Sequence, residues 1–189
     1  MSSSVRSGIA AVAGRRIDAP DAERKFPPSA ESVVKGDVKR ILSDRSIGVL
    51  VASAACGADI VALEAAMELG VRTRIILPFD RERFRETSVV DRGEEWGQRY
   101  DAILNQAARP DIVVLEAGEG DDDDAYGRAT ARIVDEASTL ARERGSTPLA
   151  IAIWDERPRD SGDATKDFMD RASAAGMHIV SISTLAKKG

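Results

Sequence analysis

Six short apolar segments alternate with amphipathic segments along this chain of 189 residues, and this alternation restricts the fold more than any other feature. The apolar segments are uninterrupted, as in strands of a parallel sheet that is covered on both faces. We therefore expect an α/β fold with three layers, an open parallel sheet of about six strands with helices on both faces. The expected strands are Gly8–Ala13, Ile47–Ala52, Arg72–Leu77, Asp111–Glu116, Leu149–Trp154 and His178–Ser183. The expected helices are Ser29–Leu42, Ala58–Leu69, Glu94–Ala107, Asp124–Arg144 and Thr165–Ala175.

The bulk properties favour one domain inside the cell. A chain of this length with 43% hydrophobic residues can bury one substantial core, so we predict a flexible N-terminal tail at residues 1–7 and a single domain at residues 8–189. The formal charge of −5 provides no general attraction for nucleic acid, so we do not expect a nucleic acid partner. The single cysteine and the lack of a signal segment or a membrane-length apolar run indicate a cytoplasmic protein that does not enter a membrane.

Two connections are longer than a compact crossover requires, namely Arg15–Pro28 and Pro78–Arg92. Each follows the carboxyl end of an expected strand, which is the edge where open α/β sheets bind their ligands. A long loop in a small domain is either functional or disordered. The position of these loops favours the functional interpretation, in which they cover a bound ligand.

The clearest candidate for a binding site is the turn Ser53–Asp59, which follows the strand Ile47–Ala52 and opens a helix. Its small side chains would leave backbone N–H groups at the helix N-terminus accessible to a phosphate. Ser53, Ala54 and Gly57 are therefore predicted to contact the ligand. Asp59 has two interpretations, because it could accept from a ribose hydroxyl or simply complement the helix dipole.

Three further segments carry candidate ligands for an anion. These residues are Gly14, Arg15 and Arg16 after the first strand, Arg85 and Ser88 in the second long loop, and Ser161, Gly162 and Thr165 after the fifth strand. Arginine forks and hydroxyl groups beside a strand end suit a phosphate. Each segment also has a structural interpretation. The first would be a solvated turn, the second a short exposed helix of alternating charges, and the third a helix N-terminus capped by Asp163 or Thr165.

Glu116 is the candidate catalytic carboxylate, should the protein be an enzyme. It ends the fourth expected strand, and in a Rossmann-like strand order the first and fourth strands are neighbours at the switch point. Glu116 would then lie across the crevice from Gly14. There it could bind ribose hydroxyls or act as an acid or nucleophile on a glycosidic bond, or it is a polar strand end in water.

Other reactive residues have structural interpretations. Cys56 lacks a base, because the single histidine, His178, begins the last strand at the opposite end of the sheet. The acidic run Asp121–Asp124 is better explained as a solvated loop before a helix than as a magnesium site, since consecutive carboxylates point in different directions. We therefore predict no metal site.

The segments Gly14–Arg16 and Ser53–Ile60, together with the Ala-rich helix and strand that follow, resemble the SLOG superfamily. That superfamily joins the DNA-processing protein A fold with the Lonely-guy, lysine-decarboxylase-like fold. The resemblance is clearest between Gly48 and Pro78, where Gly57-Ala58-Asp59 matches a Gly-Ile-Asp-like turn. It implies a Rossmann-like nucleotide-binding domain whose site is lined by Gly14, Arg15, Ser53, Gly57 and Asp59.

Members of this superfamily include phosphoribohydrolases, DNA-binding proteins and sensors of nucleotide-derived signals. The Pro-Gly-Gly-x-Gly-Thr-x-x-Glu motif of the phosphoribohydrolases is absent, and the nearest segment here is Glu116–Gly120. The resemblance therefore implies binding or sensing of a nucleotide or nucleotide-derived small molecule. We assign no cofactor beyond such a ligand. The alternatives are an N-glycosidic bond hydrolase and a structural or oligomerisation domain with a degenerate pocket. We further expect a homo-oligomer or an associated effector domain.

Overall fold

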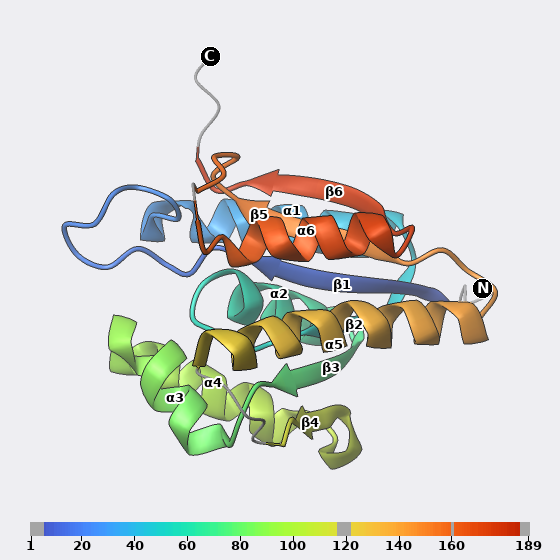
Figure 1. Ribbon diagram of the computed structural model, residues 1–189, viewed down its shortest axis with the longest axis horizontal. Helices are drawn as coiled ribbons and strands as arrows, with labels where there is room; N and C mark the ends of the chain where they lie inside the picture. Colours follow the sequence, from blue (N-terminus) through green and yellow to red (C-terminus); the bar gives the residue numbers. More distant parts are fainter. Residues whose placement is uncertain (1–5, 117–121, 160, 186–189) are drawn as a thin grey trace.

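A six-stranded, all-parallel sheet forms the centre of the computed structural model, which describes residues 6–116, 122–159 and 161–185 (Figure 1). The strand order is β4-β3-β2-β1-β5-β6. The strands are β1 (Gly8–Gly14), β2 (Ile47–Ala52), β3 (Arg72–Leu77), β4 (Ile112–Val114), β5 (Leu149–Trp154) and β6 (His178–Ser183).

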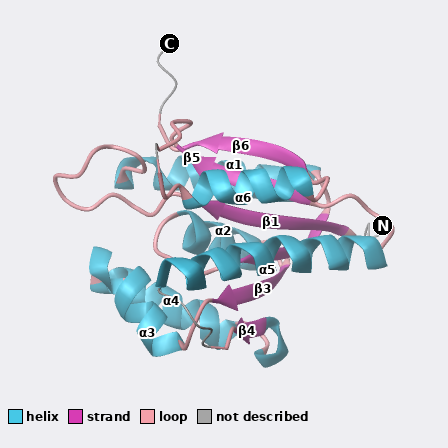
Figure 2. Ribbon diagram, viewed as in Figure 1, coloured by secondary structure: helices cyan, strands magenta, loops and turns pink. Residues whose placement is uncertain are grey.

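Helices lie on both faces of the sheet, so the expected three-layer architecture is confirmed (Figure 2). The residues that the structure describes form six α-helices. They are α1 (Glu31–Asp44), α2 (Ala58–Glu68), α3 (Arg81–Ser88), α4 (Glu94–Gln106), α5 (Asp122–Glu143) and α6 (Ala164–Ala174). Successive residues of β1 serve opposite faces, as side chains of a strand must. Val12 packs in the core beneath α1, α2 and α4, whereas Ala11 packs in the core beneath α5 and α6.

Four of the expected strands have the predicted bounds, and β1 is one residue longer. The fourth strand is shorter than expected because β4 lies at the edge and pairs only with the last three residues of β3. The helix α3 was expected only as the structural alternative for the second long loop. Gly70, Gly145 and Gly176, each of which lies shortly after a helix, have the positive φ angles that favour glycine at a helix end.

The predicted neighbour of the first strand is wrong. β1 pairs with β2 on one side and with β5 on the other. The topological switch point, where the strand order reverses, therefore lies between β1 and β5. β4, which precedes Glu116, is instead the edge strand next to β3. Because β2 and β3 intervene, Glu116 is three strand spacings from Gly14, or roughly 14 Å. Glu116 is exposed and cannot face Gly14 across a crevice.

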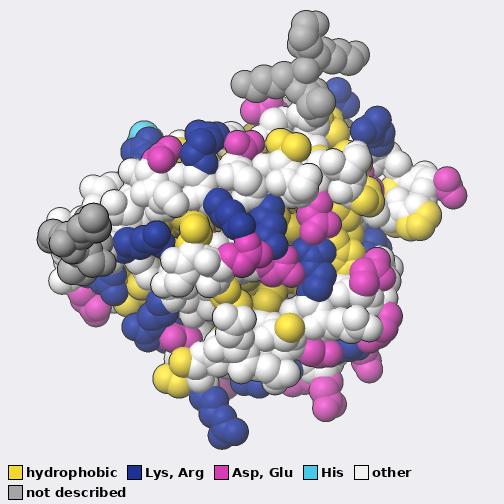
Figure 3. All heavy atoms as spheres, turned by 180° about the vertical axis from the view of Figure 1, so that it is seen from behind, with side chains coloured by type: hydrophobic (Ala, Val, Ile, Leu, Met, Phe, Trp, Pro, Cys, Tyr) yellow, Lys and Arg dark blue, Asp and Glu magenta, His cyan; other side chains and the backbone are white. Residues whose placement is uncertain are grey.

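The surface carries mixed charge. On the reverse of the molecule, basic and acidic side chains are interspersed rather than separated (Figure 3). Lys35 and Arg99, for example, both pair with Glu64. Every helix of the described part of the chain is too short or too polar to cross a bilayer.

Candidate functional site

Two adjoining cavities lie at the carboxyl end of β1, at the point where the strand order reverses. We call them the apolar cavity, of about 420 Å³, and the basic cavity, of about 330 Å³. Both are lined by Gly14 and Arg16 and by the first residues of α6, Ala164 and Thr165. Open α/β sheets bind ligands in this position, because loops from neighbouring strands part there in opposite directions.

The apolar cavity has an aromatic and aliphatic wall with a few polar groups. Phe84, Ala129 and Ile133 contribute the apolar surface. Tyr126 of α5 adds an aromatic ring, which packs edge-on against Phe79 with ring centroids 5.6 Å apart. The Tyr126 hydroxyl lies 2.5 Å from the Ser88 hydroxyl oxygen, so the polar tip of the ring has a partner. This combination suits a flat organic group, such as a nucleobase, with a small number of hydrogen-bonding positions.

Asp59 is the buried carboxyl group of this cavity. Burial raises its pKa from 3.8 to about 7, although the Ala55 backbone N–H and the charge of Arg16 act in the opposite direction. The Ala55 N–H donates to Asp59 Oδ2 at 3.2 Å, so the side chain closes the turn that precedes α2. Asp59 is one of the residues that line the cavity. A buried carboxyl group with a raised pKa beside a cavity is a candidate functional group.

Arg16 separates the two cavities and lines both. One guanidinium nitrogen donates to the sulfur of Cys56 at 3.3 Å and pairs with Asp91. Its Nε is buried without a hydrogen-bond partner among the described residues, and 35% of the side chain remains exposed. A buried donor without an acceptor costs free energy, which an incoming acceptor group would recover.

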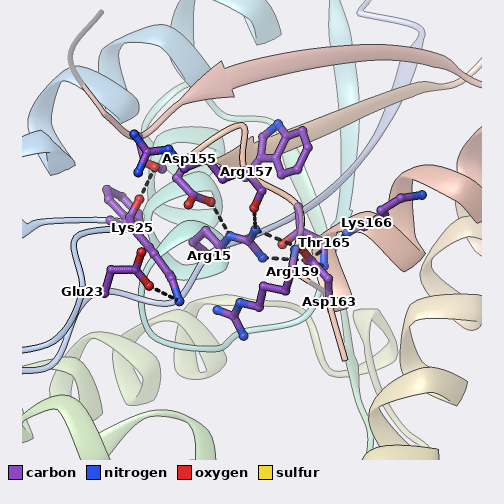
Figure 4. Close-up of polar contacts among 12 residues, drawn as sticks. Arg15, Glu23, Lys25, Asp155, Arg157, Arg159, Asp163, Thr165 and Lys166 are labelled. Atoms are coloured by element: carbon purple, nitrogen blue, oxygen red, sulfur yellow. Dashed lines mark hydrogen bonds and ion pairs between the residues drawn. The ribbon is translucent and has the colours of Figure 1, made fainter. Parts of the chain in front are cut away.

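The basic cavity is lined by five cationic residues and two carboxylates. The cations are Arg15, Arg16, Lys25, Arg92 and Arg159, and the carboxylates are Asp18 and Glu23. Both carboxylates are engaged, since Asp18 accepts the backbone N–H groups of Lys25 and Phe26 and Glu23 pairs with Lys25. In Figure 4, the side chains of Lys25 and Arg159 approach the same region from different segments of the chain. The field in this cavity therefore favours an anion.

Arg15, which was predicted to contact the ligand, lines the basic cavity, but its guanidinium is engaged by other residues of the protein (Figure 4). The side chain is only 3% exposed. Its Nε donates to Asp155 Oδ1 at 2.7 Å, and its two terminal nitrogens donate to Asp163 at 2.7 and 3.0 Å. One of these also donates to the carbonyl of Arg157 at 2.8 Å. Four of the five guanidinium N–H groups therefore donate within the protein. We call Arg15, Asp155 and Asp163 the Arg15 cluster.

Asp163 also occupies the N-terminus of α6, which was predicted to hold a second anion. Burial alone would raise the pKa of Asp163, but hydrogen bonds from Arg15 and from backbone N–H groups hold it well below its ordinary value. The carboxylate accepts from the backbone N–H of Thr165 and Lys166. The capping interpretation is thus confirmed. Ser161 is exposed and lines neither cavity, whereas Gly162 lines the basic cavity and Thr165 lines both.

The turn before α2 is packed against protein and offers no open phosphate cradle. The backbone N–H groups of Ala55, Cys56 and Ala58 already donate to Asp59, Ser88 and Arg15. Ala54 is fully buried. A β-carbon at Gly57 would lie 2.4 Å from the backbone nitrogen of Ile17, so glycine is required by the close approach of the chain that follows β1.

The remaining predicted residues divide between the site and the surface. Ser53 and Ser88 line the apolar cavity. Arg85 does not line it, because its guanidinium pairs with Glu94 and Asp101 of α4. As expected, Cys56 and His178 lie at opposite ends of the strands, and burial raises the pKa of the Cys56 thiol despite Arg16.

The acidic run begins at Asp121, which lies outside the described residues, as do residues 117–120. Within the described ranges, no group of three or more His, Cys, Asp or Glu side chains could hold a metal ion.

The sequence analysis missed four residues that line the cavities, namely Tyr126, Lys25, Arg92 and Arg159. Lys25 and Arg92 lie in the two long loops, whose length and position did indicate that they could contact a ligand. No comparable indication in the sequence pointed to Tyr126 or Arg159.

Comparison with known proteins found no matching family model and no matching curated protein. Among solved structures, the chain is similar to DNA processing protein A from Streptococcus pneumoniae, with 16% sequence identity and a TM-score of 0.45. The match covers 93% of this chain and 59% of that one, so this chain spans less than two thirds of its length.

The Arg15 cluster predicts a large loss of stability when the guanidinium is removed. Arg15→Ala leaves two buried carboxylates without their partner, and we expect the free energy of unfolding to fall by about 3–5 kcal/mol. Urea denaturation followed by circular dichroism measures it. Arg40→Ala, which removes an exposed arginine paired with Asp37, is the matched control and should change little. Equal losses in both variants would contradict the structural role of Arg15.

The raised pKa of Asp59 predicts a stability difference that depends on pH. Because ionising this group is costlier in the folded protein, its contribution to stability falls as pH rises from about 4 to about 7. Asp59→Asn removes the charge, so it should be more stable than the wild type at pH 8, by about 2–4 kcal/mol. The difference should shrink towards zero at pH 4. Denaturation at several pH values tests this, and a difference independent of pH would contradict it.

Proposed function

We propose that this protein binds a nucleotide or a nucleotide-derived small molecule at the carboxyl end of β1. The main support for this proposal is the pair of adjoining cavities, one apolar and one basic, which share Arg16 in their lining. A nucleotide has the same division, with a flat organic part joined to an anionic part. The switch point between β1 and β5 is also where open α/β sheets accept such ligands.

The organic part would occupy the apolar cavity. Its volume of about 420 Å³ lies in the range of small-molecule sites. Phe84 and Ile133 would contact the base, while Ser53, Asp59 and Thr130 supply the few polar groups that fix an orientation. Asp59 can accept a hydrogen bond when ionised and donate one when protonated.

The phosphate would lie near Arg16, within reach of the cations of the basic cavity. This assignment replaces Arg15, whose donors are engaged, by its neighbour in sequence. Arg16 has a buried Nε without a partner in the described structure, and a phosphate oxygen is a strong acceptor for such a group. Arg92 and Arg159 add positive charge on the same side.

A binding or sensing role fits the side chains better than nucleophilic catalysis does. Cys56 is buried with a raised pKa, and His178 lies at the opposite end of the strands. The resemblance of the segments around Gly14 and Gly57 to the SLOG superfamily supports the same class of ligand. Family membership is part of this proposal.

Arg16→Ala should weaken the binding of phosphorylated nucleotides by about 10- to 100-fold, since a hydrogen bond to a charged group contributes about 1.5–3 kcal/mol. Binding of the corresponding nucleoside should change little. Isothermal titration calorimetry with AMP, ADP-ribose, NAD, cyclic dinucleotides and adenosine measures this. Arg40→Ala is the control for loss of one positive charge away from the site. If the wild type binds none of these ligands, the proposed function is wrong.

Hydrolysis of an N-glycosidic bond is the second candidate function, and the position of Asp59 in the apolar cavity favours it. The carboxyl group would donate its proton to the departing base, while water adds its hydroxyl to the sugar carbon and returns a proton to Asp59. Incubation with nucleoside monophosphates should then release free base. Asp59→Asn should abolish release while binding is retained. A wild type that binds nucleotides but releases no base would exclude this function.

A further inference from the structure

The outer side of β6 is an open edge of the sheet. β6 pairs with β5 in continuous register over all six of its residues, and no strand of the described part of the chain lies on its other side (Figure 1). The strand contains no proline and no Lys, Arg, Asp or Glu. Such residues, together with bulges, are the usual means by which proteins prevent pairing at a sheet edge. β6 is therefore able to pair with another strand.

The backbone groups of β6 alternate between β5 and the outer side. The His178 N–H donates to the Pro148 carbonyl, and the Thr184 N–H donates to the Trp154 carbonyl. Because the N–H and C=O groups of successive strand residues point to opposite sides, the even-numbered residues of β6 bond to β5. The odd-numbered residues therefore direct their N–H and C=O groups outward. These residues are Ile179, Ser181 and Ser183.

This outward row matches a second copy of itself. In an antiparallel pair, opposed residues exchange two N–H···O bonds when their backbone groups face each other. A two-fold axis through Ser181 places this residue opposite its own copy and places Ile179 opposite Ser183. Every outward residue then meets another outward residue, which gives about six hydrogen bonds. An axis one residue earlier would set Ser183 against Met177, whose N–H already donates to Ala172.

A groove of about 500 Å³ lies beside this edge, between α1 and β6. Val33, Val180 and Leu185 contribute apolar surface to it. Val33 is 65% exposed, more than any other large hydrophobic side chain of the described residues. Apolar surface next to an unpaired strand is characteristic of a protein–protein contact.

The charges that α1 and its last turn present to the groove are self-complementary. Acidic and basic residues alternate there, in the order Asp37, Arg40, Asp44 and Arg45. A two-fold axis reverses this order in the second copy, so Asp37 comes opposite Arg45, and Arg40 opposite Asp44. An interface around a two-fold axis requires such a match of a surface with itself. Exposed pairs add little affinity, so these charges favour the orientation of the two copies.

We propose that two copies of this chain associate through β6, paired antiparallel about Ser181, so that their sheets join into one continuous sheet. The match of the outward row with itself and the alternating charges favour a second copy over an unrelated extended peptide, which would need neither. No residue that lines the groove also lines the apolar or the basic cavity. The inference is therefore independent of the proposed function.

A proline at the centre of the pairing tests the inference. Ser181→Pro removes an N–H group that faces away from β5, and an edge strand accepts proline in that position. Ser181→Ala is the matched control, because both variants lose the bond from Trp154 Nε1 to Ser181 Oγ, 3.2 Å long, and only the proline removes the backbone donor. Analytical ultracentrifugation of the full chain measures the dissociation constant, and circular dichroism checks the fold.

The wild type should form a dimer. Ser181→Pro should raise its dissociation constant about 10- to 100-fold, since both hydrogen bonds of the central pair are lost. Ser181→Ala should behave as the wild type. A wild type that is monomeric at every concentration overturns the inference. A dimer that Ser181→Pro leaves intact, or that both variants weaken equally, also overturns it.

Amide hydrogen exchange of the wild type, followed by NMR, provides a second readout that does not depend on a variant folding. In a concentrated sample the amides of Ile179, Ser181 and Ser183 should exchange slowly, and dilution should make them exchange faster. The amides of Val180 and Ile182, which bond to β5, should exchange slowly at both concentrations. Fast exchange of the three outward amides in the concentrated sample would place any dimer contact elsewhere and contradict the inference.

Discussion

The crevice depends on one buried interaction, the guanidinium of Arg15 between the carboxylates of Asp155 and Asp163. It joins the end of β1 to the end of β5, 140 residues later in the chain, and to the N-terminus of α6, 148 residues later. These segments also border the switch point. Since a buried charge is tolerated only when it is paired, the three must stay together for the protein to fold. The position of the candidate site is therefore fixed by the same contacts that stabilise the fold.

Arg15 and Arg16 show how burial divides two adjacent, chemically identical residues. Arg15 points between β1 and β5 and is 3% exposed, with its donors engaged. Arg16 points into the crevice, keeps 35% of its side chain exposed and retains a buried nitrogen without a partner. Arg16 therefore keeps more of its side chain available to a ligand than Arg15 does. The cations contributed by the two long loops and by Arg159 give the basic cavity its positive charge.

The errors of the sequence analysis have a common cause. Gly57 and Ser161 were assigned to phosphate because glycine and serine are common in both ligand loops and packed turns. The structure uses Gly57 for the close approach of the chain after β1, and it fills the N-terminus of α6 with Asp163. Glu116 was misplaced because an uninterrupted apolar strand is compatible with any central position in a parallel sheet. Its neighbours are decided by crossover connections, which local sequence does not specify.

The sequence by itself determined the elements, their order and the parallel sheet, because apolar periodicity and helix-ending glycines are local properties. It also located the edge of the sheet where the cavities lie, through the two long loops. Tertiary structure alone decided that β1 lies between β2 and β5, that Tyr126 reaches the same cavity as Asp59, and that Arg16 stays partly exposed while Arg15 is buried. Those outcomes depend on contacts between residues far apart in the chain, and burial and charge act only once these residues have been brought together.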